Sequence, residues 1–234
     1  MATEKEKPAW VPSAILHRAF QIAADGHAEC VRKGSDIPYL GHLLGVCSLV
    51  IEAGGSENQA AAALLHDLLE DTPTTEEELA LMLGGSHGIA VAAMVAGCTD
   101  TTFARKEEIK EQQKGWTDER KAESWWNDRK SPYIDKLTDT MISPGDDSYV
   151  LVSLADKTYN AENTAADLRG LSGPARDALW SKFNVGYDYQ RKWYRGLVTA
   201  YTTDNKTYSS GEQALLNRFV AAVDEMFPDE GGPT

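Results

Sequence analysis

One short segment places a histidine and three carboxylates inside an otherwise apolar, helix-forming run. The segment reads Ala62-Ala63-Leu64-Leu65-His66-Asp67-Leu68-Leu69-Glu70-Asp71-Thr72. Side chains four residues apart share one face of a helix, so a continuous helix stacks His66 over Glu70. Asp67 and Asp71 share a face by the same spacing. Burying such groups without partners is costly, and a divalent metal held by imidazole and carboxylate is the simplest compensation. The pattern therefore predicts a helical protein with a layout for metal-assisted hydrolysis.

The composition is that of a soluble globular protein. Its 234 residues are 42% hydrophobic and 25% charged, which suits one large domain or two small ones with a substantial core. No run of about 18 apolar residues is present, and the N-terminal segment lacks an apolar signal core. We therefore expect no membrane span and a cytoplasmic protein. Cys30, Cys47 and Cys98 are not in metal-ligand spacing, and their apolar helical context predicts reduced, buried thiols.

The net charge of −13 argues against a general nucleic-acid binder, which presents a basic stripe. A small anionic ligand is still possible, because a metal and a local group of basic side chains can attract it despite the negative net charge. Such basic side chains would have to lie around the pocket itself. Lys157, directly after Asp156, is one candidate, although its side chain could instead point into solvent. Arg129 and Lys130 are further candidates.

The chain reads as helix after helix, so we expect a single all-α domain over residues 1–234. Its core spans about residues 14–203, and residues 228–234 form a frayed tail. Gly54-Gly55 ends one predicted helix, and Thr74-Thr75 followed by three glutamates begins another. The predicted helices cover about 12–32, 40–53, 57–70, 74 onward, 89–95, 173–203 and 209–227.

Two segments allow two interpretations each. Residues 149–155 have the β-branched content of a strand, but a buried helix explains the same apolar run equally well. Residues 100–130 are polar and charged and include three tryptophans. They form either a solvated helix pair with aromatic anchors, or a lid or rim from which Arg129 and Lys130 reach the pocket.

Three more residues complete a possible metal site. His42 begins an apolar helix, Asp156 follows an apolar run, and Asn160 lies one helical turn past Asp156. Each has a structural explanation when taken singly: His42 could cap a helix, and Asp156 could pair with Lys157. His66 could be a core histidine. Together with Asp67, the two histidines and Asp156 form a set with positions left for water and substrate.

The chain resembles the HD-domain phosphohydrolases, and among them the hydrolase domain of the RelA/SpoT group and the small alarmone hydrolases. Four segments in the family's order carry the resemblance, over about residues 14–170: Val31-Arg32-Lys33-Gly34, Pro38-Tyr39-Leu40-Gly41-His42, Ala62 to Thr72, and Leu154-Ala155-Asp156-Lys157-Thr158-Tyr159-Asn160. The segments 179–184 and 193–195 are similar to the C-terminal part of bacterial stand-alone HD proteins. No synthetase domain follows, so the chain looks like a hydrolase only.

The resemblance implies an HD-domain helical bundle and assigns roles residue by residue. One metal, usually Mn²⁺, is held by His42, His66, Asp67 and Asp156. Glu70 and Asp71 match the acidic pair that activates the attacking water. Arg32 and Lys33 match residues that contact substrate phosphates, and Asn160 matches a residue near the ribose. These roles fit the chemistry, because a metal acidifies bound water and basic groups hold the phosphates.

The chain departs from the family at positions that flank the pocket. Ser153 stands where lysine is common, Thr158 where an apolar residue is common, and Ala-Glu-Asn follows Asn160 where an arginine is usual. The expected activity is removal of the 3′-pyrophosphate from (p)ppGpp or (p)ppApp, and these departures leave the base open. The alternatives are an HD phosphohydrolase acting on another nucleotide or phosphorylated dinucleotide, and a non-catalytic nucleotide sensor. The sequence does not indicate an oligomeric state.

Overall fold

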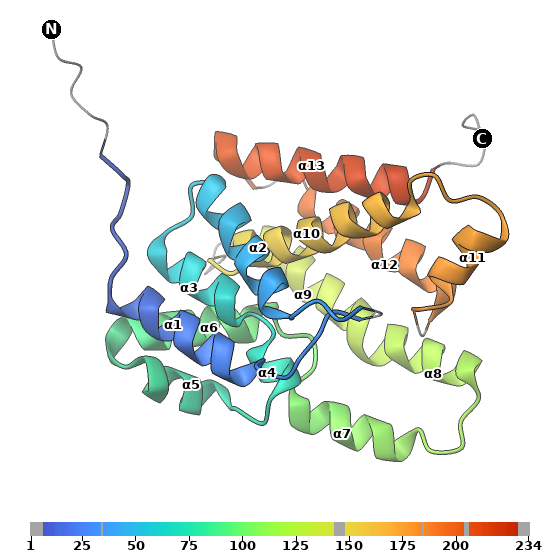
Figure 1. Cartoon of the computed structure of the whole chain (residues 1–234), viewed down its shortest axis with the longest axis horizontal. Coiled ribbons are helices and arrows are strands. Elements are labelled where there is room, and N and C mark those ends of the chain that lie inside the picture. The colour runs from blue at the N-terminus through green and yellow to red at the C-terminus, as the bar shows by residue number, and fades with distance from the viewer. Residues whose placement is uncertain (1–6, 34, 143–147, 184, 204–205, 229–234) are drawn as a thin grey trace, which may run out of the picture.

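The prediction of an all-α fold is confirmed. The computed structural model describes residues 7–33, 35–142, 148–183, 185–203 and 206–228, and its secondary structure there is helical apart from one isolated antiparallel bridge, Val31 to Pro38 (Figure 1). No helix within these ranges combines the length and apolar character needed to cross a membrane.

Fourteen helical elements lie in the described part of the chain. They are α1 (Ala14–Gly26), α2 (Leu40–Glu52), α3 (Glu57–Leu65), α4 (Leu68–Asp71), α5 (Glu76–Leu83), α6 (Gly85–Cys98), α7 (Phe103–Gln112), α8 (Asp118–Trp125), the π-helical turn η1 (Trp126–Lys130), α9 (Ser131–Ile142), α10 (Val150–Leu168), α11 (Pro174–Trp180), α12 (Gly186–Tyr201) and α13 (Ser210–Met226). Several begin with a side-chain cap. The sequence predicted an N-cap and first-turn acids at the start of α5. Thr75 is this N-cap, and it forms a capping box with Glu78.

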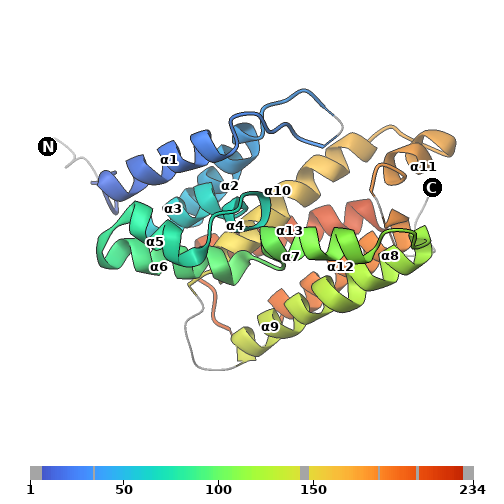
Figure 2. The same cartoon turned by 90° about the horizontal axis from the view of Figure 1, so that it is seen from below.

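Helix α10 runs through the middle of the bundle and decides one of the open alternatives. It packs against α2, α3, α6 and α13 (Figures 1 and 2). Every residue from Val150 to Asp156 is buried. A helix that is buried on all sides has no polar face, so its sequence lacks the 3.6-residue periodicity that separates a helix from a buried strand. The apolar run at 149–155 is therefore the start of a helix.

Helix α3 is the second buried helix, and its small side chains let its neighbours approach. Residues 60–63 are four alanines, all buried, and α1, α2, α6 and α10 contact this helix. Ser56 and Gln59 form a capping box that fixes where it begins. The alanines keep α2 and α10 close to the C-terminal end of α3, where His66 follows.

The prediction of a first helix to about residue 32 is wrong, because α1 ends at Gly26. The backbone beyond it pairs locally instead: the Arg32 N–H donates to the Ile37 carbonyl (2.8 Å) and the Tyr39 N–H to the Cys30 carbonyl (2.8 Å). These bonds replace the helical ones. As a result Cys30 lies in an exposed loop, which contradicts its predicted burial, whereas Cys47 and Cys98 are buried as expected.

The prediction of one helix over 57–70 is also wrong, since α3 stops at Leu65 and α4 starts at Leu68. His66 Nδ1 lies 2.8 Å from the Ala63 carbonyl oxygen, which in a continuing helix takes the backbone N–H of Asp67. The Asp67 backbone (φ −96°, ψ −3°) has left the ideal helical range. The histidine side chain thus takes the place of a helical hydrogen bond, and the chain turns at the candidate metal ligands.

The buried core continues beyond residue 203, where the predicted core ended. Phe219, Val223, Met226 and Phe227 are fully buried in the same hydrophobic cluster as α10, because α13 packs along that helix. Most of the predicted frayed tail, residues 229–234, lies outside the described residues, and Pro228 is exposed.

Candidate metal centre

Four side chains from three separate parts of the chain meet at one point. His42 lies on α2, His66 and Asp67 form the turn between α3 and α4, and Asp156 lies on α10. His42 Nε2 is 3.2 Å from His66 Nε2. Asp156 Oδ1 lies 3.3 Å from the first of these nitrogens and 3.4 Å from the second. Asp67 Oδ2 lies 2.9 Å from His66 Nε2 and 3.6 Å from His42 Nε2.

Asp67 is the least enclosed of the four. His42, His66 and Asp156 are buried, and their ligand atoms all lie within 4.8 Å of one another. The Asp67 side chain is 19% exposed. Its Oδ2 accepts a hydrogen bond of 2.5 Å from the Tyr39 hydroxyl. The three buried groups therefore form the tight part of the cluster, and Asp67 closes its more open side.

The donor set and its electrostatics suit a divalent cation. Burial lowers the pKa of His42 and of His66, but the carboxylates of Asp156 and Asp67 outweigh it and raise both. Burial likewise raises the pKa of the two carboxyl groups, but other charges outweigh it. The imidazoles lower the pKa of Asp67, and Lys157 together with the imidazoles lowers that of Asp156. The cluster thus favours positive charge at its centre. Two imidazole nitrogens and two carboxylates are ligands of Mn²⁺, Fe²⁺ and Zn²⁺, so the residues fit such an ion.

An aromatic stack supports the centre from one side, and its residues had no predicted role. The Tyr39 ring lies 5.1 Å from the His42 ring and 5.3 Å from the His27 ring. His27 is buried, and its Nε2 lies 4.0 Å from Asp71 Oδ2. The Tyr159 ring contacts His42 from α10 at 5.1 Å. Tyr39 and Tyr159 belong to the quoted sequence segments, but only the fold shows that they pack on a ligand.

The predicted catalytic pair is held by a lysine that the sequence did not single out. Lys106 Nζ on α7 lies 3.0 Å from Glu70 Oε2 and 3.1 Å from Asp71 Oδ1. Glu70 Oε1 accepts the Asp100 backbone N–H at 3.1 Å. Burial, and next the charge of Asp100, raise the pKa of Glu70, while Lys106 lowers it. The result is a fixed carboxylate with a higher proton affinity than an exposed glutamate.

The segment 100–130 combines both of its predicted interpretations. Helix α7 has no buried residue, as a solvated helix should. At the far end of the segment, however, Arg129 Nη2 lies 2.9 Å from Asp100 Oδ1, and Lys130 also pairs with Asp100. Lys130 Nζ lies over the Trp193 ring at 4.7 Å. The two basic residues therefore reach the acidic pair through Asp100, which no sequence argument had picked out of the charged segment.

The predicted substrate-binding residues fall into two groups. Lys157 and Asn160 bond directly to the candidate ligand Asp156: Lys157 Nζ lies 2.5 Å from its Oδ2, and Asn160 Nδ2 donates to its Oδ1 at 2.6 Å. Arg32 and Lys33 lie on the loop after α1 and contact no candidate ligand in the contacts described. Arg32 donates to Asn163 at 3.2 Å and lies over the Tyr159 ring, and Lys33 lies over the Phe183 ring.

The positions that depart from the family have structural partners. The Ser153 hydroxyl lies 2.6 Å from the Tyr133 hydroxyl and 2.6 Å from that of Tyr201, in the buried core. Thr158 bonds back to the Leu154 carbonyl at 2.7 Å. Glu162, which follows Asn160 by two residues, makes a two-pronged ion pair with Arg218 of α13. Ser153 and Glu162 thus connect α10 to neighbouring helices, and Thr158 bonds within α10 itself.

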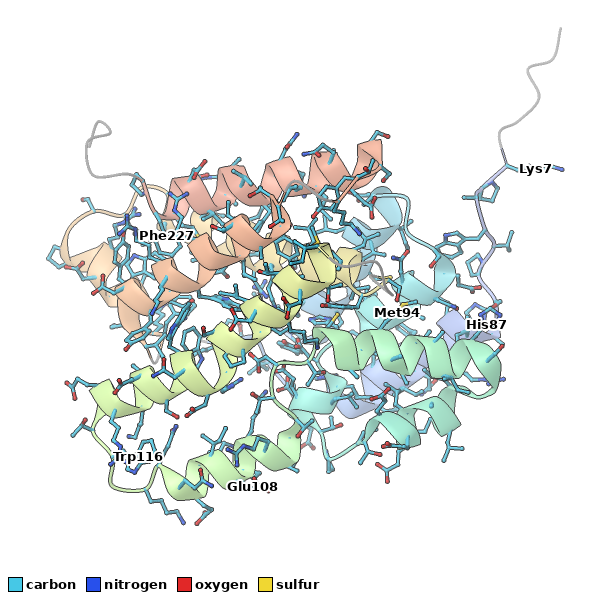
Figure 3. All side chains as sticks on the ribbon, turned by 180° about the vertical axis from the view of Figure 1, so that it is seen from behind. Lys7, His87, Met94, Glu108, Trp116 and Phe227 are labelled. Carbon is cyan, nitrogen blue, oxygen red and sulfur yellow. The ribbon has the colours of Figure 1, made fainter. Side chains whose placement is uncertain are left out.

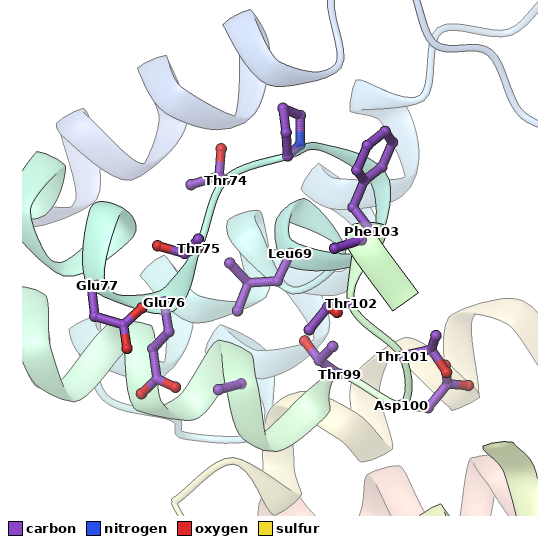
Figure 4. Close-up of a pocket in the computed structure, with 13 residues that line it drawn as sticks. Leu69, Thr74, Thr75, Glu76, Glu77, Thr99, Asp100, Thr101, Thr102 and Phe103 are labelled. Atoms are coloured by element: carbon purple, nitrogen blue, oxygen red, sulfur yellow. The ribbon is translucent and has the colours of Figure 1, made fainter. Parts of the chain in front are cut away.

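A small pocket borders Asp100 on the side of α5 and α6. It has a volume of about 380 Å³. Figure 4 shows Asp100 and Thr101 at one end of it and Glu76 and Glu77 at the other. Thr75 and Thr102 cap α5 and α7, and Thr99 bonds to the Val95 carbonyl, so these hydroxyls are engaged in local structure.

The protein belongs to the HD domain family, whose pattern matches residues 19–175. It is 40% identical over 84 residues to a guanosine-3′,5′-bis(diphosphate) 3′-pyrophosphohydrolase of Aquifex aeolicus, which is 36% of this chain and 11% of the relative. It is 41% identical over 75 residues to the enzyme of that name, MESH1, of Xenopus tropicalis, covering 31% of this chain and 42% of the relative. It is 29% identical over 145 residues to the bifunctional (p)ppGpp synthase/hydrolase SpoT of Escherichia coli K12, and this match covers 62% of this chain and 17% of the relative. The matches thus span less than half of these relatives' lengths.

Solved structures share the fold. One is described as a metazoan ortholog of SpoT that hydrolyzes ppGpp; it has a TM-score of 0.60 and 22% identity, over 91% of this chain and 97% of the other. A crystal structure of a protein from Listeria monocytogenes EGD-e has a TM-score of 0.56 and 24% identity, over 81% of this chain and 96% of the other. At these identities the likeness establishes the helical architecture alone.

Proposed function

We propose that this protein is a metal-dependent hydrolase that removes the 3′-pyrophosphate from (p)ppGpp or (p)ppApp in the cytoplasm, with Mn²⁺ as its metal. The observation that carries the proposal is the buried two-histidine, two-carboxylate cluster with an acidic pair held beside it. The activities for which the similar proteins are named supply the substrate class.

His42, His66, Asp67 and Asp156 would hold the ion. When bound, a divalent metal lowers the pKa of water and offsets charge on a phosphoryl group. Glu70 would take the proton from the attacking water, a role for which a raised pKa is suited. The water oxygen bonds to the phosphorus on the ribose 3′ oxygen, the bond between that oxygen and phosphorus breaks, and the 3′ oxygen takes a proton. Nucleotide and inorganic pyrophosphate leave.

The remaining predicted residues would position the substrate. Lys157 and Asn160 both contact Asp156, so they would orient this ligand and face whatever binds beside it. Arg32 is held by Asn163 and by the Tyr159 ring, which fixes its guanidinium group for contact with a phosphate. Asp71 shares Lys106 with Glu70, so it would keep that lysine beside the catalytic glutamate.

A panel of nucleotides tests the proposal. The protein is incubated with Mn²⁺ and with ppGpp, pppGpp, ppApp, nucleoside monophosphates and phosphorylated dinucleotides, and products are separated by chromatography. The expected result is release of inorganic pyrophosphate from the 3′-pyrophosphorylated nucleotides. Turnover of another compound alone would favour a different HD phosphohydrolase, and binding without turnover would favour a nucleotide sensor. Mg²⁺, Fe²⁺ and Zn²⁺ in parallel reactions test the choice of metal.

A further inference from the structure

A basic cleft lies between α7, α8 and the residues that precede α12. It encloses about 540 Å³. Its described lining carries four basic side chains, Lys106, Lys110, Lys121 and Arg129, against one carboxylate, Asp118. Trp125 and Phe183 contribute aromatic surface to the same walls. Each of these four bases also pairs with at least one carboxylate, so the cleft gathers cationic groups without a net excess of positive charge. An anion with several charges can take the place of the exposed carboxylates and bind these groups together.

The inner end of the cleft belongs to the candidate catalytic centre. Lys106 lines the cleft and also bonds to Glu70 and Asp71, at 3.0 and 3.1 Å. Arg129 lines it and bonds to Asp100, at 2.9 Å. An anion in the cleft would therefore lie directly behind the residues that hold the acidic pair.

The outer end of the cleft carries lysines that can turn toward a ligand. Lys110 pairs with Glu107 and Lys121 with Asp118, each three residues earlier on its own helix. Lys110 is 69% exposed, and Asp118 is 91% exposed. Exposed pairs of this kind contribute little to stability, so exchanging a carboxylate for a phosphate partner costs little.

The hairpin that forms the cleft is held in place. Arg120 stacks on the Trp116 ring at 3.9 Å, where the chain turns from α7 to α8, and Gln113 donates to Ser124 at 3.2 Å across the hairpin. Figure 3 shows Trp116 at this turn and Glu108 along α7. These contacts fix the two helices relative to each other, so binding does not have to order the backbone of the cleft.

We infer that this cleft binds a pyrophosphoryl group, and this inference rests on the proposed function for its substrate class. Two closely spaced phosphates match its several basic groups better than a monophosphate does. The group has two possible sources. It is either the 5′-diphosphate of the substrate or the pyrophosphate released from the 3′ position.

Titration calorimetry with inorganic pyrophosphate tests the cleft without requiring turnover. The test variant is Lys110→Gln, Lys121→Gln, because neither lysine contacts the acidic pair. The matched control is Lys7→Gln, Lys114→Gln, which removes the same charge outside the cleft; Lys114 has the same ion pair to the third preceding residue. We expect roughly tenfold weaker binding for the test variant, lessening with added salt, and a change of less than about twofold for the control.

Equal affinity in all three proteins, as expected if pyrophosphate binds only at the metal centre, would overturn the inference, and so would the absence of pyrophosphate binding by the unaltered protein. If the nucleotide panel shows no hydrolysis but the test variant alone binds pyrophosphate more weakly, the proposed function is wrong, whereas the inference that the cleft binds pyrophosphate is supported. Thermal unfolding of each variant verifies that it is folded.

Kinetics then identify the source of the group. The KM of the test variant is compared with that of the unaltered protein for ppGpp and for the same nucleotide with a free 5′-hydroxyl. A rise in KM confined to ppGpp assigns the cleft to the 5′-diphosphate. An equal rise for both substrates, with weaker product inhibition by pyrophosphate, assigns it to the leaving group. Unchanged KM and unchanged inhibition contradict a role for the cleft in the reaction.

Discussion

Glu70 is the residue whose surroundings say most about its chemistry. One oxygen accepts the Asp100 backbone N–H and the other pairs with Lys106, so both are fixed in direction. Burial and Asp100 raise its pKa, which brings a carboxylate closer to the range in which it exchanges protons near neutral pH.

Replacing Glu70 with glutamine is expected to lower kcat by roughly 10²-fold or more, because the amide cannot accept the proton. The amide keeps a hydrogen-bond acceptor for the Asp100 N–H, so metal binding should change little. Steady-state kinetics and metal content measured on the same sample separate the two effects. A variant with the kcat of the unaltered protein would show that Glu70 is structural and that another group takes the proton.

The pH dependence of kcat tests the same role, because activity requires the ionised form of Glu70. A raised pKa means that the acid limb of the profile lies at higher pH than for an exposed glutamate. Lys106 lowers this pKa, so Lys106→Met should move the acid limb to still higher pH. If the acid limb lies at the same pH in Lys106→Met and in the unaltered protein, a group other than Glu70 controls it.

At the scale of helices, the contact between α2 and α10 sets the distance between His42 and Asp156. Gly45 lies where the two helices come closest: a Cβ there meets Tyr159 Cε2 at 2.0 Å. The Tyr159 ring has little room to move, because it packs against His42 and lies under Arg32. The glycine therefore allows the approach that brings ligands from two helices together.

Gly45→Ala is expected to destabilise the protein by about 2 kcal/mol through overpacking, and to weaken metal binding by displacing Tyr159. Gly41→Ala, one turn earlier on α2, is the matched control, because a Cβ there meets nothing within 4 Å. Its higher helix propensity should leave stability unchanged or raise it slightly. Chemical denaturation and metal titration measure both effects. Equal stability of the two variants would show that the helices can separate without cost.

At the scale of the whole molecule, the four candidate ligands come from α2, from the turn between α3 and α4, and from α10, so a bound ion would tie these segments together. An ion that binds only the folded state stabilises it by about 2.7 kcal/mol at a hundred times its Kd. For a chain of this size, that corresponds to a rise in Tm of about 5–10 °C. We expect chelation to remove this rise and Mn²⁺ to restore it. Differential scanning calorimetry with and without chelator gives the measurement.

Asp156→Asn should abolish the rise in Tm that Mn²⁺ produces, because the asparagine amide is a weaker ligand than the carboxylate and carries no charge. The control is Asp135→Asn, the same chemical change at an exposed position of α9. It should retain the full response to metal. If Asp156→Asn still gains stability from Mn²⁺, or if the unaltered protein gains none, the ion is bound elsewhere or not at all.

The sequence by itself determined the all-α class and the residues that form the metal cluster. Both follow from local chemistry. Buried alanine and leucine runs with capping residues specify helices, and a histidine beside acids in such a run favours a cation as their shared partner. His42, His66, Asp67 and Asp156 were identified in this way, with the family resemblance adding their roles, and the fold brings the four together.

Only the tertiary structure decided how these residues are supported. Lys106, Asp100, Tyr39 and His27 reach the centre across contacts between segments distant in sequence, and no local periodicity records such contacts. The break between α3 and α4 was equally invisible, because a His66 side chain takes a carbonyl that helix propensity assigns to the backbone. Side chains and backbone compete for the same hydrogen bonds, and packing decides which of them wins.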